Sequence, residues 1–239
     1  MSVLPAPAEK SAYVRRMFGT IAARYDLLNR MMTFGLDQGW RRFAVAQVLP
    51  TSPRGRHQAL DVATGTGDFL PILHSADPDA LVIGLDFSLP MMQAGDAKIE
   101  ATSGRGAYVG GDALSLPFPD DSFDLITTGF GMRNVADLMS ALREMHRVAK
   151  PGARMACLEV ARPRSVLLRW GHRFYFTRIV PLLGALVGGN IEAYTYLPQS
   201  AEQFPPPEHL RDLLRAAGWR HVRYQLLGLG AVAVHIAEK

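Results

Sequence analysis

The chain has 239 residues, of which 48% are hydrophobic and 20% are charged. This composition is typical of a folded globular domain and excludes an intrinsically disordered chain. The single cysteine, Cys157, excludes a disulfide framework and a cysteine-based metal site, so we expect no metal. The net charge of +4 at pH 7 is too small to indicate nucleic-acid binding, and we expect no nucleic-acid partner.

No segment of the sequence is predicted to span a membrane. Residues 1–10 lack the apolar core of a signal peptide. The longest nearly uncharged apolar run covers residues 179–189, which is much shorter than the ~20 residues that a membrane-spanning helix needs. We therefore expect a cytoplasmic protein that at most lies on the inner face of the cell membrane.

Residues 11–50 are predicted to form a helical cover at the N-terminus. An apolar stripe repeats there at spacings of three and four residues, as on one face of a helix. The stripe consists of Phe18, Ile21, Tyr25, Leu28 and Met32. We expect most of these side chains to pack against the rest of the domain.

Beyond the turn at residues 52–55, short apolar runs alternate with segments of helical character. The predicted strands are 59–63, 81–86, 107–109, 123–128, 155–160, 222–227 and 231–237. The predicted helices between them are 68–75, 88–101, 136–149 and 205–217. This alternation predicts an α/β fold with a single domain over residues 1–239, whose seven-stranded, mostly parallel sheet ends in an antiparallel C-terminal strand pair.

Residues 162–204 form an unusually long connection after the fifth strand. The connection is rich in aromatic residues, and a connection of this length commonly carries function, so we expect a helical insertion that covers the substrate. Within residues 141–178, lysine and arginine clearly outnumber the acidic residues Glu144 and Glu159. This basic region predicts contact with an anionic membrane surface, although a solvated helix face explains it equally well.

The turn after the first predicted strand carries the sequence Asp61-Val-Ala-Thr-Gly65-Thr-Gly67. Glycines at such a turn let the backbone approach a ligand closely. Asp86, at the end of the next strand, is placed to accept hydrogen bonds from both hydroxyls of a ribose. Residues 111–113 follow the third strand, where a polar side chain and a backbone amide can bind an adenine edge. These features predict a cofactor that contains a nucleoside.

The turn favours a sulfonium cofactor over a dinucleotide. The dinucleotide fingerprint needs a third glycine at position 70, where the chain has Leu70. The acidic residue before the glycines, Asp61, resembles the first motif of class I S-adenosylmethionine-dependent methyltransferases, which have a Rossmann-like fold. An acidic side chain near this turn suits a positively charged cofactor. A dinucleotide-dependent dehydrogenase is the weaker alternative.

The sequence further resembles the C-methyltransferases of ubiquinone and menaquinone biosynthesis over residues 14–235. The matching segments include 14–26, 60–68, 129–135, 147–152 and 194–200. The matches in the insertion are the more specific ones, because the insertion is not common to the fold. The chain departs from the family at Asp37, where histidine is usual, and at Gly129, where part of the family has serine.

The resemblance implies an enzyme that uses S-adenosyl-L-methionine to methylate a ring carbon of a polyprenyl quinol. It favours the conversion of demethylmenaquinol to menaquinol, with a benzoquinol of the ubiquinone pathway as the alternative. The implied cofactor-binding residues are Asp61, Gly65, Thr66, Gly67, Asp86, Asp112 and Ala113. A homodimer is a further expectation.

Three residues are candidates for catalysis. The guanidinium of Arg133 can stabilise a developing phenolate, Asn134 can orient the ring, and Glu159 is a candidate proton acceptor. Arg133 could instead form a structural pair with an acidic residue such as Asp137, and Glu159 could be a cap or form an ion pair with Arg162. Tyr194 and Tyr196 could line the quinol pocket together with Arg133, or they could only pack the insertion.

Other functions stay open at this stage. A methyltransferase of the same fold that acts on another small molecule or on RNA would share the cofactor motif, because a fold does not determine function. A regulator that binds the cofactor without catalysis would share it too. Cys157 lies in the middle of a predicted strand, so we expect an inert buried thiol rather than a nucleophile.

Overall fold

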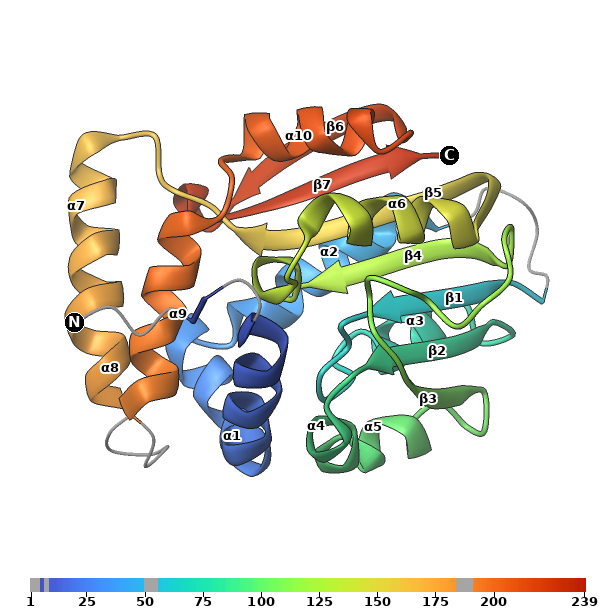
Figure 1. Cartoon of the computed structure of the whole chain (residues 1–239), viewed down its shortest axis with the longest axis horizontal. Helices are drawn as coiled ribbons and strands as arrows, with labels where there is room; N and C mark the ends of the chain where they lie inside the picture. The colour runs from blue at the N-terminus through green and yellow to red at the C-terminus, as the bar shows by residue number, and fades with distance from the viewer. Residues whose placement is uncertain (1–4, 7–8, 50–55, 184–190) are drawn as a thin grey trace.

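A seven-stranded sheet forms the centre of the computed structural model, which describes residues 5–6, 9–49, 56–183 and 191–239 (Figure 1). The strand order is β3-β2-β1-β4-β5-β7-β6. The strands are β1 (Gln58–Val62), β2 (Leu81–Asp86), β3 (Gly106–Gly110), β4 (Phe123–Gly129), β5 (Ala149–Val160), β6 (Arg220–Leu227) and β7 (Val232–Glu238). Strand β7 pairs antiparallel with both β5 and β6, and the pairs among β1 to β5 are parallel. The predicted fold class and the antiparallel C-terminal pair are confirmed.

Helices cover both faces of the sheet. They are α2 (Leu36–Val48), α3 (Leu70–Ala76), α4 (Leu89–Ala94), α5 (Asp96–Glu100), α6 (Leu138–Val148) and α10 (Pro207–Ala216). Successive residues of β1 point to opposite faces, as the strand period requires. Ala59 packs in a cluster with α2 and α3, while Leu60 packs in a cluster with α6 and α10.

The predicted helix 88–101 is broken at Gly95, where α4 ends and α5 begins. The hydroxyl of Tyr108 lies 3.1 Å from the carbonyl oxygen of Gly95 and 3.0 Å from that of Thr66. A Cβ atom at position 95 would overlap both the Tyr108 hydroxyl and the Thr66 backbone. Glycine is therefore required here by a close approach, which no periodicity in the sequence reveals.

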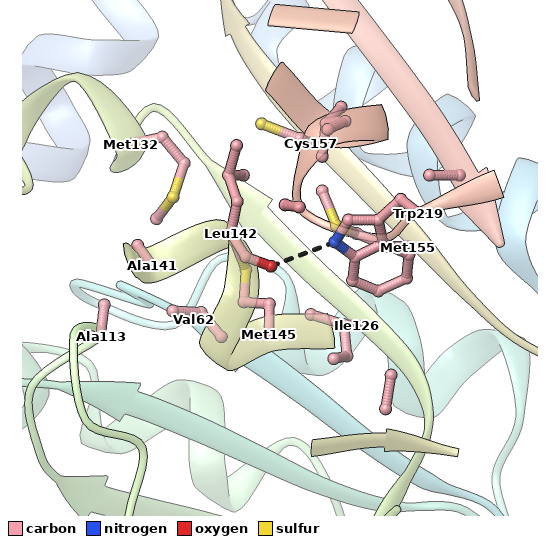
Figure 2. Packing of buried hydrophobic residues seen from close by; sticks show 14 of the residues in the cluster. Val62, Ala113, Ile126, Met132, Ala141, Leu142, Met145, Met155, Cys157 and Trp219 are labelled. Carbon is pink, nitrogen blue, oxygen red and sulfur yellow. Dashed lines mark hydrogen bonds between the residues drawn. The ribbon is translucent and has the colours of Figure 1, made fainter. Parts of the chain in front are cut away.

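The largest cluster of buried side chains includes Trp219, at the start of β6, and the apolar face of α6. Figure 2 shows the indole of Trp219 pointing toward Leu142, and its Nε1 donates a hydrogen bond of 3.1 Å to the Leu142 carbonyl. Cys157 is fully buried in the same cluster, and burial raises the pKa of its thiol. The thiol is therefore structural, as the sequence predicts.

The N-terminal segment forms α1 (Lys10–Thr33) and α2, separated by Phe34 and Gly35 in left-handed backbone conformations. Helix α1 lies between the carboxyl ends of the central strands and the insertion (Figure 1). The members of the predicted apolar stripe pack in one cluster with Tyr196 of the insertion. The stripe therefore faces the insertion.

The insertion is helical, as predicted. It consists of α7 (Val166–Phe174), a π-helical turn η3 (Tyr175–Ile179), α8 (Val180–Leu183) and α9 (Ile191–Gln203), all on one side of the molecule in Figure 1. The apolar run 179–189 lies partly outside the described residues. In the described part of the chain, every helix is too short or too polar to cross a membrane.

Candidate functional site

A cavity of about 460 Å³ lies at the carboxyl ends of β1, β2 and β4 and is covered by α1. The loop after β1 forms its floor. Gly65 and Gly67 have φ values of +58° and +79°. Residues other than glycine rarely adopt such positive φ values. The Gly67 amide donates to the Thr64 carbonyl, which closes the turn at 2.9 Å. The predicted glycine turn is therefore present, and it faces the cavity.

Asp86 lies on the cavity wall and connects β2 to this turn. Its carboxylate accepts hydrogen bonds of 2.8 Å from the backbone amides of Gly65 and Ser88. Burial raises the pKa of Asp86, and the two amides oppose that effect. Because each carboxylate oxygen has a second lone pair, both oxygens can still accept a bond from a ribose hydroxyl.

Asp61 is 1% exposed and lies deeper in the same cavity. It accepts hydrogen bonds from the hydroxyls of Thr64 at 2.6 Å and Thr127 at 2.8 Å. Burial raises the pKa of Asp61 to about 7, although the two hydroxyls lower it. A cation in the cavity would favour the ionised form of Asp61, so this carboxyl suits a sulfonium or ammonium group.

The other predicted cofactor residues lie on the same wall, but their polar groups differ in how far they are already hydrogen-bonded within the protein. Asp112 and Ala113 line the cavity, and one oxygen of Asp112 accepts from the Leu114 amide at 2.9 Å. Thr66 also lines the cavity, but its hydroxyl donates to Asp26 at 2.6 Å and accepts from Lys98 at 2.7 Å. The proton of this hydroxyl is therefore already engaged within the protein.

A network of charged side chains fastens α1 and α2 to the cofactor turn. Asp68 pairs with Arg30 at 3.0 Å, Arg41 at 3.3 Å and Lys98 at 2.7 Å. Burial would raise the pKa of Asp68, but these cations lower it to about 2. Asp37 is 1% exposed and pairs with both arginines of the network. Asp37 is thus held by two guanidinium groups.

A second cavity of about 540 Å³ lies between α1, α2 and the insertion, and most of its lining is apolar. The lining includes Met32, Phe34, Trp40, Leu167, Tyr175 and Leu229. Tyr25, Arg41 and Phe130 line both cavities, so the two spaces share one wall. The site therefore combines a polar cavity with an adjacent apolar one.

The predicted catalytic residues lie close together, but they do not all line the cavities. Arg133, in the short helix η2 (Met132–Asn134), donates from Nη1 to Oε2 of Glu159 at 3.0 Å. Both side chains are buried, so Arg133 pairs with Glu159 and not with Asp137, which caps α6 instead. Among the described residues, the walls of the two cavities include Arg133 and Asn134 but not Glu159.

Of the two predicted pocket tyrosines, the structure describes the side chain of Tyr196 only. The hydroxyl of Tyr196 donates to Oδ1 of Asn134 at 3.2 Å, and its side chain is 2% exposed. Tyr196 lines a small space of about 30 Å³ next to Arg133 rather than the large apolar cavity. The side chain of Tyr194 lies outside the described residues.

Sequence reasoning missed two residues of the shared wall. Arg41 is 4% exposed, and its guanidinium lies 5.4 Å from the ring centre of Phe130. The guanidinium of Arg133 lies 5.8 Å from the same ring. In the part of the chain that the structure describes, the buried Nε atoms of both arginines have no hydrogen-bond partner. Tyr25 was assigned only to packing, and burial raises the pKa of its hydroxyl against the effect of both arginines.

The basic region 141–178 does not form one surface. Arg147 pairs with Asp120 and Glu144, and Lys150 pairs with Asp124, both near the amino end of β4. Arg164 and Arg169 lie at the insertion, which begins after the carboxyl end of β5. The basic region 141–178 therefore combines lysine and arginine side chains that lie near opposite ends of the strands.

Comparisons with known proteins identify the family of the chain. Residues 7–239 match the model of the ubiE/COQ5 methyltransferase family. The chain is 57% identical to the demethylmenaquinone methyltransferase of Roseiflexus castenholzii, covering 100% of this chain and 98% of that protein. It is 42% identical to the ubiquinone/menaquinone biosynthesis C-methyltransferase UbiE of Geotalea daltonii, covering 97% and 98%.

Among solved structures, a Thermotoga maritima S-adenosylmethionine-dependent methyltransferase, a possible histamine N-methyltransferase, matches with a TM-score of 0.64. The match covers 94% of this chain and 99% of that one at 21% identity, so it supports the fold alone. The polar cavity, with its glycine turn and carboxylates, fits the cofactor of this fold. The chain belongs to the ubiE/COQ5 methyltransferase family, and its cofactor is S-adenosyl-L-methionine.

Proposed function

We propose that the protein methylates a ring carbon of a polyprenyl quinol, and that its substrate is demethylmenaquinol. The observation that carries this proposal is the apolar cavity that shares a wall with the cofactor cavity. Its size and apolar lining suit an aromatic ring with the first part of a prenyl tail. The curated relatives named for this reaction add support, since they match the chain over nearly its whole length.

The polar side chains of the shared wall suit the electronic demand of the reaction. An aromatic carbon becomes a good nucleophile when a neighbouring hydroxyl ionises, so the site needs cations near that oxygen. Arg41 and Arg133 each retain a buried N–H group without a partner among the described residues. Unpartnered buried donors are rare and need an explanation. We assign these two donors to the quinol oxygen.

The remaining groups position these donors. Glu159 accepts from the Arg133 guanidinium at 3.0 Å and from the Val160 amide at 3.0 Å. Because Glu159 lies behind Arg133 and off the cavity walls, we assign it to positioning rather than to direct proton transfer. Asn134 is held between the Tyr196 hydroxyl and the Phe130 carbonyl, which it reaches at 3.4 Å. It orients the ring in this scheme.

The cofactor supplies the methyl group as an electrophile, and the chain aligns it. Asp61 faces the positive end of the cofactor, Asp86 binds its ribose, and Asp112 with Ala113 binds its adenine. Alignment of donor and acceptor in a near-attack geometry can contribute about 7–11 kcal/mol to catalysis. Since a polyprenyl quinol resides in a bilayer, the protein takes its substrate as a peripheral membrane protein on the cytoplasmic face.

The direct test is methyl transfer with the purified protein. We expect the labelled methyl group of S-adenosylmethionine to appear on a ring carbon of chemically reduced demethylmenaquinone. The oxidised quinone should not react, because it has no hydroxyl to ionise. Total RNA and a demethylated benzoquinol are the competing acceptors. Faster transfer to either of these than to the naphthoquinol would contradict the proposal.

A further inference from the structure

The mouth of the apolar cavity carries an unusual number of exposed apolar side chains. Phe34 is 81% exposed and Leu229 is 79% exposed, although both line the cavity. Both residues also have a left-handed backbone, with φ values of 53° and 57°. Glycine or asparagine is the usual choice at such positions, so this backbone conformation is costly for Phe and Leu, and exposing their side chains to water is a separate cost. These residues are therefore suited to a surface that is covered when the protein functions.

Helix α7 extends the same apolar surface. Its exposed apolar residues are Val166 (80%), Leu167 (78%), Trp170 (70%) and Phe174 (52%). Leu167 also lines the cavity, and the rings of Trp170 and Phe174 are stacked with centres 6.1 Å apart. In Figure 1, α7 lies at the outer edge of the molecule, far from β3. The helix thus continues the cavity rim with apolar side chains that are mostly exposed to solvent.

The charge of this region indicates what covers it. Residues 160–183 contain five arginines and no acidic residue. At the start of α7, Arg162, Arg164 and Arg169 line a third cavity of about 330 Å³ that contains one carboxylate, Glu208. Arg162 donates to the carbonyl of Glu202, and Arg169 donates to the carbonyls of Pro163 and Arg164 at 3.2 Å. Carbonyl partners leave the charges of Arg162 and Arg169 uncompensated, whereas the charge of Arg164 is paired with Glu208 at 2.7 Å.

We propose that α7, Phe34 and Leu229 form a docking surface for an anionic bilayer, with Arg162 and Arg169 binding lipid phosphates at its edge. This inference deepens the proposed function and rests on it. Apolar side chains inserted at the interface and cations beside them are the two contributions that hold a protein on an anionic membrane. The cavity then opens directly into the acyl chains, so a prenyl tail can enter without crossing water.

The test uses vesicles that contain no quinol, so it does not depend on the chemistry. The wild-type protein should co-sediment with phosphatidylcholine vesicles that contain phosphatidylglycerol. The double variant V166S/W170S changes only residues outside the cavity lining, and it should bind these vesicles at least about tenfold more weakly. R162Q/R169Q should weaken binding roughly tenfold on anionic vesicles and far less on neutral ones. The matched controls are L81S and R215Q, which change an exposed leucine and an exposed arginine elsewhere.

Equal vesicle binding by the wild type and V166S/W170S would refute the proposed docking surface. So would a wild-type dimer that V166S/W170S dissociates in the absence of vesicles, because the partner would then be a second copy of the chain. Activity separates the two proposals. V166S/W170S should keep the wild-type kcat/KM on a short-tailed quinol in solution and lose activity on a long-tailed quinol in vesicles. Vesicle binding without methylation of any quinol would refute the proposed function alone.

Discussion

The guanidinium of Arg133, at the wall of the apolar cavity, lies 3.0 Å from the carboxylate of Glu159, which is buried behind it. A buried ion pair contributes little net stability, because removing both charges from water offsets most of their attraction. Breaking such a pair is costly, however, because one charge is left alone. The pair is thus better suited to holding an N–H donor at a fixed place than to stabilising the fold.

This pair leads to a prediction that separates structure from chemistry. Arg133→Ala should lower the free energy of unfolding by about 3–5 kcal/mol, because Glu159 becomes an unpaired buried charge. The double variant Arg133→Met with Glu159→Gln should recover most of that loss in urea unfolding. It should still lack methyl transfer, since the donor to the quinol oxygen is gone. An active double variant would show that Arg133 has only a structural role.

The raised pKa of Asp61 predicts a pH dependence of cofactor binding. Because burial raises this pKa to about 7, many molecules hold a proton on Asp61 at neutral pH. A sulfonium cation favours the ionised form, so affinity should rise between about pH 6 and pH 8 as the proton is released. Calorimetric titration in two buffers with different ionisation enthalpies measures that release.

Asp61→Asn is the control for this experiment. It should bind S-adenosylmethionine about tenfold more weakly, since one favourable charge interaction of ~1.4 kcal/mol is lost. The titration of the cofactor's own amino group is common to both proteins and cancels in the comparison. Identical pH profiles for the two proteins would mean that Asp61 does not respond to the cofactor.

His235 predicts a loss of stability in acid. Burial lowers its pKa from 6.5 to about 4, and its Nδ1 is buried without a partner among the described residues. A lowered folded pKa means that the stability from neutral His235 is fully present above pH 6.5 and is lost as the pH falls through about 4. The loss should reach about 3 kcal/mol, since each pKa unit corresponds to ~1.4 kcal/mol.

Comparing the wild type with His235→Gln isolates this contribution. Asp61 has the opposite sign, because its folded pKa is raised and its contribution is lost as the pH rises through about 7. The Asp61 effect is shared by both proteins. The difference between their free energies of unfolding should therefore change only between about pH 6.5 and pH 4. A constant difference across that range would contradict the prediction.

Trp219 tests the packing of β6 against α6. Trp219→Ala should lower the free energy of unfolding by about 3–5 kcal/mol, because a large buried ring is replaced by a cavity. Trp219→Phe should cost less, since it keeps most of the apolar contact but loses the 3.1 Å hydrogen bond to Leu142. Trp170→Phe is the matched control, and its exposed position predicts a change within about 0.5 kcal/mol. Denaturant unfolding followed by far-UV circular dichroism measures all three.

Local patterns in the chain were enough to predict the sheet, the cofactor turn and the acidic residue after β2. These features depend on residues that lie close together in sequence: a short continuous apolar run, a glycine turn and a carboxylate at a strand end. The positions of Asp61 and Asp86 on one cavity wall follow because parallel strands place their carboxyl ends at one edge. The partner of Arg133 could not be predicted, since Glu159 lies 26 positions away on another strand.

The substrate side of the site depended on long-range contacts. The helical spacing of Tyr25 explains it as a packing residue, and only the arrangement of α1 and α2 against the sheet brings Tyr25 and Arg41 to the shared wall. The break at Gly95 is likewise set by Tyr108 from another strand. Periodicity reports which face of an element is buried, but the choice of neighbour depends on how distant elements pack, and that packing placed two arginines beside an apolar cavity.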